Sequence, residues 1–254
     1  MPEKLTSDKL MNIRNELAKI DVVILCGGLG TRLRPISKDL PKALMPFAGR
    51  PFIDFLIESL LPFGFRRFIL CVGHLKDKVQ AHFQKRDYEV IFSEEMEPLG
   101  TGGTVKKAMP LIKCPSFLVM NGDSICPVDF SLFYTFHLLK GGILSLVLVK
   151  PQPGQDYGVV EVDDNQRVIS FREKNECEKS MFINGGIYFM MRDILNYMPA
   201  EARFSLEYDL FPKIIPAGCY GFQTKSEVID IGTPERYVQA LKRLFPSNSD
   251  EESL

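Results

Sequence analysis

The chain has 254 residues and a nearly balanced charge, with 31 lysine and arginine residues against 32 aspartate and glutamate residues. This length is enough to bury the core of one large α/β domain. Because the formal net charge is −1, no overall positive field collects polyanions, and we expect neither nucleic acid nor a membrane surface as a partner. The six cysteines include no Cys-x-x-Cys pair, which indicates reduced thiols in a cytoplasmic protein rather than a disulfide framework or a structural zinc site.

The first twenty residues form a separate segment before the first predicted strand. Leu10, Ile13, Leu17 and Ile20 recur at helical spacing, which predicts a helical extension over residues 1–20. We expect this helix to pack on the domain's own surface, and self-association of the chain through its apolar stripe is the alternative. The segment lacks the apolar core of a signal peptide, and no run elsewhere reaches the roughly 18 apolar residues of a membrane span.

From Asp21 to about Lys150, short apolar runs alternate with amphipathic stretches. This alternation is typical of a mostly parallel sheet that is covered by helices on both faces. The predicted strands span residues 22–26, 68–73, 89–94, 117–123 and 144–150. The predicted helices span residues 52–61, 77–84, 103–111 and 131–139.

After Lys150 the pattern changes to strand-like runs that are separated by turn residues. These runs indicate a small, partly antiparallel extension that closes over the strand ends of the first half. The predicted strands of this second half span residues 157–164, 167–174 and 182–191.

The rest of the chain predicts two further helices and a tail. One helix is predicted over residues 206–215, and Thr233-Pro234-Glu235 predicts the start of a last helix that ends near Phe245. The residues beyond this helix are polar and predict a disordered tail. We therefore divide the chain into an N-terminal extension, one domain with two halves, and the tail, with bounds at 1–20, 21–245 (21–150 and 151–245) and 246–254.

A glycine-rich turn directly follows the first predicted strand. Gly27, Gly28 and Gly30 let backbone N–H groups approach a phosphate chain closely. The turn is not the dinucleotide fingerprint, because leucine occupies the third glycine position, and it is not a P-loop, because no Gly-Lys-Ser/Thr follows. Arg32 and Lys42 add a rigid fork of donors and a compact point charge, which together suit a triphosphate.

The segment GGLGTRLRPISKDLPKALMPFAGRPF resembles the signature of the sugar-1-phosphate nucleotidyltransferases, GGxGTRLxP followed by PKxLxP. The resemblance continues through EPLGTGG (97–103), MNGD (120–123), FREK (171–174), INGGIYF (183–189) and VIDIGTPERY (228–237). Within that family the chain is most similar to the D-glycero-D-manno-heptose 1-phosphate guanylyltransferases. The resemblance implies the nucleotide-diphospho-sugar transferase fold, a Rossmann-like three-layer α/β/α sandwich with a mixed, mostly parallel sheet and a small sugar-binding extension.

The resemblance also implies the activity. Members of the family join a nucleoside triphosphate to a sugar 1-phosphate and release pyrophosphate. The favoured substrates are GTP and D-glycero-D-manno-heptose 1-phosphate, which give GDP-heptose for lipopolysaccharide or capsule synthesis. A uridylyl- or thymidylyltransferase acting on a hexose or amino-sugar 1-phosphate is the first alternative, and a non-catalytic nucleotide-sugar sensor is the second.

The resemblance assigns roles to individual residues. The predicted catalytic residues are Arg32, Lys42, Asp123 and Asp230, and the two aspartates are the predicted Mg²⁺ ligands. The predicted nucleotide-binding residues are Leu25, Gly27, Gly28, Gly30, Thr31, Arg32, Leu99, Gly100, Thr101 and Gly102. The predicted residues of the sugar-phosphate site are Gly158, Glu173, Lys174 and Asn184. The attacking phosphate is already ionised near neutral pH, so no general base is required, and the three histidines are expected to be surface or structural residues.

Overall fold

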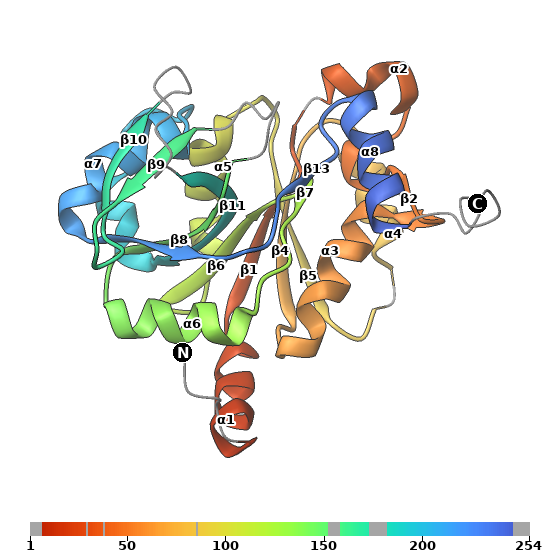
Figure 1. The fold of residues 1–254 in the computed structure, drawn as a ribbon. Coiled ribbons are helices and arrows are strands. Elements are labelled where there is room, and N and C mark those ends of the chain that lie inside the picture. The colour runs from red at the N-terminus through yellow and green to blue at the C-terminus, as the bar shows by residue number, and fades with distance from the viewer. Residues whose placement is uncertain are drawn as a thin grey trace, which may run out of the picture.

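A mixed β-sheet forms the centre of the structure, with helices on both of its faces (Figure 1). The computed structural model describes residues 7–28, 30–37, 39–84, 86–151, 158–172 and 182–245. Within these residues the central sheet has nine strands, and two short two-stranded sheets lie beside it. The predicted tail over 246–254 lies outside the described residues.

Four parallel strands make up one side of the sheet in the order β5-β4-β1-β6. Their bounds are β1 Asp21–Leu25, β4 Arg67–Val72, β5 Glu89–Glu94 and β6 Ser116–Asn121. The chain runs from β1 to β4 on one side and reaches β6 on the other, so the strand order reverses at β1. Ligands of open α/β sheets bind at such a reversal, in the crevice outside the carboxyl ends of the strands.

The other side of the sheet is largely antiparallel. Its strands are β8 Leu144–Val149, β9 Val159–Val162, β10 Val168–Arg172, β11 Phe182–Met191 and β12 Cys219–Gln223. β11 lies antiparallel between β6 and β8, and its first residues also pair with β9. The predicted antiparallel character of the second half is thus confirmed, with one difference. β11 is an inner strand of the central sheet and not part of a cover over its strand ends.

Two clusters of buried apolar residues cover the two faces of the sheet. Val22 and Ile24 of β1 belong to one cluster, whereas Val23 belongs to the other, as the alternation of side chains along a strand requires. The first face is covered by α3 Phe52–Leu60, α4 Lys76–His82, α6 Phe130–Lys140 and α8 Pro234–Leu244. The second is covered by α5 Gly100–Ala108, the π-helix Leu206–Leu210 and α7 Phe211–Ile214. The predicted three-layer α/β/α sandwich is therefore confirmed.

Short elements connect these layers. They are α2 Arg34–Ser37, the hairpin of β2 Pro46–Phe47 and β3 Arg50–Pro51, and the pair of β7 Ser124–Ile125 and β13 Ile229–Asp230. The last helix begins as predicted, because the Thr233 side chain accepts a hydrogen bond from the backbone N–H of Arg236. The predicted helix over 103–111 begins earlier, at Gly100. The backbone N–H groups of Gly102 and Gly103 donate to the Phe204 carbonyl, which supports this early turn from outside the helix.

The N-terminal helix α1 spans Ser7–Leu17 and contacts α6. In Figure 1 it projects from the end of the sheet opposite α2. Leu17 and the following Ile20 are buried in the core, Ile13 packs against it, and Leu10 is 43% exposed. A helix thus lies within the predicted extension, and its C-terminal end packs on the domain through these buried residues.

The remaining features of the scaffold concern its thiols, one histidine and the length of its helices. The cysteines within the described ranges are all free thiols, and burial raises the pKa of Cys126 to about 12. His137 is a structural residue, because it is buried, its Nδ1 lies 2.9 Å from Ser145 Oγ, and burial lowers its pKa to about 4. Of the helices that the structure describes, none combines the length and the apolar character needed to cross a bilayer.

Candidate active site

The glycine-rich turn leaves β1 at the strand-order reversal, at the carboxyl end of the parallel strands. Gly30 adopts φ +58°, a left-handed conformation that favours glycine, and leads into the 3₁₀ turn Thr31–Leu33. Gly27 lies against Glu95, because a Cβ atom there would lie 3.3 Å from the Glu95 carboxyl group. Arg32 follows the turn as an exposed side chain. Gly27 and Gly28 of the turn thus line the crevice, and an exposed guanidinium group follows them.

Lys42, Asp123 and Asp230 converge beside this turn, although they come from three distant parts of the chain. Asp123 follows β6, and Lys42 Nζ donates a hydrogen bond to its Oδ2 atom at 2.6 Å. The pairing of β7 with β13 places Asp230 opposite Ser124, the neighbour of Asp123. A Cβ atom on Gly232 would lie 2.7 Å from Asp230 Oδ1 and 3.3 Å from Lys42 Nζ, so the lysine lies close to both acids.

Asp123 and Asp230 have different partners. The Asp123 side chain is 41% exposed, whereas that of Lys42 is 15% exposed, so the acid faces the crevice and the lysine stands behind it. Asp230 accepts a hydrogen bond from the Gly232 backbone N–H and pairs with Arg236 Nη1 at 3.5 Å. Among the residues described, no cluster of three or more His, Cys, Asp or Glu side chains is present. Two carboxylates suit Mg²⁺, which takes one or two protein carboxylates and completes its shell with phosphates and water.

A cavity of about 300 Å³ opens between the glycine-rich turn and the start of α5, and we call it the glycine-loop cavity. Its lining includes six residues of the predicted nucleotide set: Leu25, Gly27, Gly28, Leu99, Gly100 and Thr101. The other members lie outside this lining: Gly30 is the last glycine of the turn, and Thr31 and Arg32 follow it. Gly102 packs against the ring of Phe204, where a Cβ atom would lie 2.2 Å from the ring. Gly102 therefore serves the packing of α5 on its neighbour.

Glu95 is a buried acid in the wall of the glycine-loop cavity that the sequence analysis missed. It follows β5, and it accepts a hydrogen bond from Thr104 Oγ1 at 2.5 Å. A carboxylate has room for further donors once one such bond is made. Its position between a predicted strand and the LGTGG segment is the sequence feature that could have indicated Glu95. An acid that the fold buries there needs a hydrogen-bond partner.

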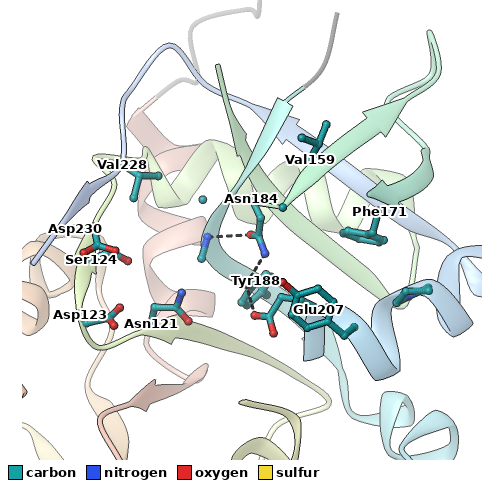
Figure 2. A pocket seen from close by; sticks show the side chains of 15 residues that line it. Asn121, Asp123, Ser124, Val159, Phe171, Asn184, Tyr188, Glu207, Val228 and Asp230 are labelled. Atoms are coloured by element: carbon teal, nitrogen blue, oxygen red, sulfur yellow. Dashed lines mark hydrogen bonds between the residues drawn. The ribbon is translucent and has the colours of Figure 1, made fainter. Parts of the chain in front are cut away.

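A second cavity of about 440 Å³ lies beside the first, at the antiparallel side of the sheet, and we call it the β11 cavity (Figure 2). Gly158 and Asn184 of the predicted sugar-phosphate set line it, together with Asp123 and Asp230. Glu173 and Lys174 lie outside the described residues. The residues of this lining that the sequence analysis missed include Asn121, Phe171, Tyr188, Glu207 and Tyr208.

A bulge in β11 turns Asn184 into this cavity. Asn184 pairs with Leu148 and Tyr188 pairs with Leu146, so three residues of β11 stand opposite a single residue of β8. Gly186 within the bulge has φ +72°, and its backbone N–H donates to Asn184 Oδ1 at 2.9 Å. Asn184 Nδ2 donates to the Tyr188 hydroxyl at 2.8 Å. The INGG sequence therefore fixes the amide of Asn184 toward the cavity, as Figure 2 shows.

The two cavities share Asn121 and Asp123. One side has a glycine-rich turn at the carboxyl ends of parallel strands, and the other has polar side chains on an antiparallel strand. Asp123, Asp230 and Lys42 lie where the two cavities meet. The fold and the site define an α/β protein with two adjoining cavities that share part of their lining.

Comparison with known proteins gives the family. The chain belongs to the nucleotidyl transferase family, whose model matches residues 21–245. It is 36% identical over 227 residues to the D-glycero-alpha-D-manno-heptose 1-phosphate guanylyltransferase of Campylobacter jejuni, covering 87% of this chain and 99% of that protein. It is 33% identical to the protein of the same name from Aneurinibacillus thermoaerophilus, covering 89% of this chain and 98% of the relative. The predicted family resemblance is confirmed.

Solved structures agree with this result. HddC from Yersinia pseudotuberculosis is 35% identical, superposes with a TM-score of 0.75, and covers 89% of this chain and 99% of its own. HddC has also been solved in complex with GMP-PN. The inositol-1-phosphate CTP transferase of T. maritima is 20% identical with a TM-score of 0.72, covers 89% of this chain and 96% of its own, and supports the fold alone. The chain is thus a nucleotidyltransferase with the fold that its sequence predicted.

Proposed function

We propose that this nucleotidyltransferase joins GTP to D-glycero-D-manno-heptose 1-phosphate and releases GDP-heptose and pyrophosphate. The observation that carries the proposal is the pair of cavities that meet at Asp123. The named activity of the two heptose 1-phosphate guanylyltransferases, which align over nearly their whole length, supports the choice of substrates. The free thiols of the described cysteines agree with a place in the cytoplasm.

The reaction requires positioning more than proton transfer. A phosphate oxygen of the sugar 1-phosphate attacks the α-phosphorus of GTP, and the bond from that phosphorus to the bridging oxygen of the β-phosphate breaks. The pyrophosphate leaves with this bridging oxygen and the electron pair of the broken bond. Because the attacking oxygen is ionised near neutral pH, the protein has to hold two anions against each other and stabilise the charge that develops.

The glycine-loop cavity is the proposed site of GTP. The backbone of Gly27 and Gly28 faces the triphosphate, Lys42 lies by the α-phosphate, and Arg32 reaches the departing pyrophosphate from its exposed position. Glu95 favours guanine, because its carboxylate only accepts hydrogen bonds and guanine offers two adjacent donors, N1–H and the N2 amino group. Uracil and thymine offer one N–H between two carbonyl oxygens, so a carboxylate fits them poorly.

The β11 cavity is the proposed site of the sugar 1-phosphate. Gly158 leaves room for the sugar ring, and the Asn184 amide can bond its hydroxyl groups. The roles of Glu173 as a hydroxyl partner and of Lys174 as a phosphate partner remain predictions from the FREK motif. In this proposal the attacking phosphate and the α-phosphate lie on either side of Asp123, which lines both cavities.

Asp123 and Asp230 are the proposed ligands of Mg²⁺. Their oxygen donors fit this cation, and Lys42 and Arg236 stand beside them as neighbouring cations. The ion would offset the repulsion between the sugar phosphate and the triphosphate when bound. Lys42 supports Asp123 in this role, because its ammonium group fixes one carboxylate oxygen and leaves the other facing the crevice.

A substrate matrix tests the proposal. The purified chain is incubated with Mg²⁺, one of GTP, UTP, dTTP, CTP or ATP, and one of heptose, mannose, glucose or glucosamine 1-phosphate, and pyrophosphate release is measured. We expect GTP with the heptose 1-phosphate to give the highest kcat/KM. Turnover of UTP or dTTP with GTP inert would overturn the guanylyltransferase proposal in favour of the first alternative. Absence of pyrophosphate with every pair would favour a nucleotide-sugar sensor.

A further inference from the structure

Glu207 lies between the two cavities and bonds toward both. It belongs to the π-helix Leu206–Leu210 and lines the β11 cavity. Its Oε2 atom accepts hydrogen bonds from Thr101 Oγ1 at 2.7 Å and from Ser205 Oγ at 2.8 Å. Thr101 is in the first turn of α5 and lines the glycine-loop cavity. One carboxylate oxygen of Glu207 therefore accepts a hydrogen bond from a residue in the wall of the glycine-loop cavity.

The second oxygen of Glu207 faces β11. Its Oε1 atom accepts from the Tyr188 hydroxyl at 3.3 Å, and that hydroxyl accepts from Asn184 Nδ2 at 2.8 Å (Figure 2). Tyr188 is fully buried, and its burial and the nearby Glu207 charge raise its pKa, so the hydroxyl stays protonated and can donate. A continuous path of hydrogen bonds thus runs from Thr101 through Glu207 and Tyr188 to Asn184.

Both ends of this path lie where a ligand would bind. At one end, Gly186 and Tyr188 use one acceptor site and one N–H of the Asn184 amide, which leaves a second N–H for a sugar hydroxyl. At the other end, α5 begins with Gly-Thr-Gly-Gly, a sequence with little helical preference of its own. The Leu206 backbone N–H donates to Thr101 Oγ1 at 2.9 Å, so segment 204–207 holds this weak turn in place.

We propose that Glu207 is a positioning residue that couples the two cavities, so that each substrate binds more tightly when the other is present. A nucleotide that packs on the first turn of α5 orders this turn and fixes the Thr101 hydroxyl on Glu207. Glu207 then holds Tyr188, and Tyr188 holds the Asn184 amide in the orientation that a sugar requires. The entropy of ordering the shared path is lost once, so the second ligand binds at a smaller cost. The inference rests on the proposed function of the two cavities.

The coupling factor is the direct measure of this inference. Calorimetry in buffer that contains Mg²⁺ throughout gives the Kd of a GTP analogue with a methylene group between its α- and β-phosphates, first without and then with saturating heptose 1-phosphate. The ratio of the two values is the coupling factor, and the reverse titration must give the same factor by linkage. We expect a factor of roughly 5 or more in the unaltered chain.

Two pairs of variants separate coupling from a purely structural role. Thr101→Val removes the hydroxyl group and keeps the branched shape, whereas Thr101→Ser keeps the hydroxyl. Tyr188→Phe removes the hydroxyl that joins Glu207 to Asn184, whereas Tyr134→Phe changes a buried tyrosine of α6. We expect Thr101→Val and Tyr188→Phe to lower the factor to about 1, and the two matched controls to keep it.

The outcomes are distinct. A factor of 1 in the unaltered chain, when it turns over GTP and the heptose 1-phosphate, overturns the inference and leaves the proposed function intact. A normal factor in both Thr101→Val and Tyr188→Phe overturns it as well, even if their Tm is lower, because the path is then only structural. If the unaltered chain binds neither probe, the proposed function is wrong and the inference falls with it.

Discussion

The two cavities of this nucleotidyltransferase are built in different ways. The glycine-loop cavity is formed by turns at the carboxyl ends of neighbouring parallel strands, and its lining includes Gly27, Gly28 and Gly100. The β11 cavity is formed by side chains of an antiparallel strand and of segments that lie far apart in the chain, from Asn121 to Asp230. The first cavity thus depends on local glycine geometry, and the second depends on long-range hydrogen bonds. Substitutions should distinguish these two kinds of construction.

The largest expected effect is at the junction of the cavities. Asp123→Asn and Asp230→Asn each keep the size of the side chain and remove a charge, and we expect each to lower kcat by roughly 10³-fold, the order of magnitude for loss of a key transition-state interaction. The double variant should cost little more than either single one, because ligands of the same ion act as a unit. Steady-state kinetics with varied Mg²⁺ check this. Independent, multiplying losses would speak against a shared ion, as would full activity in EDTA.

The next largest effect is expected at Arg32, the proposed partner of the departing pyrophosphate. We expect Arg32→Ala to lower kcat and kcat/KM together by about 10²-fold, because its guanidinium group meets charge that develops only during the reaction. Arg32 is exposed, so Tm should hardly change. Arg34→Ala is the matched control, because Arg34 is an exposed neighbour on the same segment. A normal kcat in Arg32→Ala would restrict Arg32 to the structure of the turn.

A smaller effect is expected at Glu95, and it tests the proposal that guanine is the nucleobase bound in the glycine-loop cavity. Glu95→Gln keeps an acceptor for Thr104 and removes the charge that guanine donors meet, and we expect kcat/KM for GTP to fall by about 10- to 100-fold. The value for UTP should change much less, so the ratio of the two is the quantity to measure. Glu97→Gln changes an exposed acid two residues away and serves as the control. Equal losses for GTP and UTP would show that Glu95 only supports the turn.

The smallest expected effect on catalysis is at His137, which lies outside both cavities. Its pKa is lowered to about 4 in the folded chain from 6.5, so below pH 6.5 the unfolded chain binds a proton that the folded chain does not. Stability is therefore lost as pH falls from 6.5 toward 4, by about 2 kcal/mol at pH 5. Urea unfolding of the unaltered chain and of His137→Asn at pH 7.5 and pH 5 checks this. The same pH dependence in both proteins would contradict the assignment, and kcat should be nearly equal in both.

The difference between the cavities also explains what the sequence could predict. The turn at Gly27–Gly30 and the start of the last helix at Thr233 depend on residues within a few positions of each other, and their patterns indicated them. The mostly parallel sheet followed from alternating apolar runs. The inner position of β11 did not, because strand order depends on pairing between residues far apart in the chain.

The same reason applies to the side chains that the sequence analysis missed. Glu207 and Tyr188 are of interest because of their contacts with Thr101 and Asn184, which the local sequence does not reveal. The contact between Glu207 and Thr101 joins residues 106 positions apart. The early start of α5 is a further case, because the carbonyl of Phe204 supports it from outside the helix. The motifs predicted roles for residues through their own backbone or charge. They did not predict the contacts by which Glu207 and Tyr188 join Thr101 to Asn184.

The most direct test of this division is a crystal structure of the chain with GDP-heptose and Mg²⁺. The account predicts guanine in the glycine-loop cavity within hydrogen-bond distance of Glu95, the diphosphate beside Asp123 and Lys42, and the sugar in the β11 cavity against Asn184. A base in the β11 cavity, or a sugar bound away from Asn184 and Gly158, would contradict it.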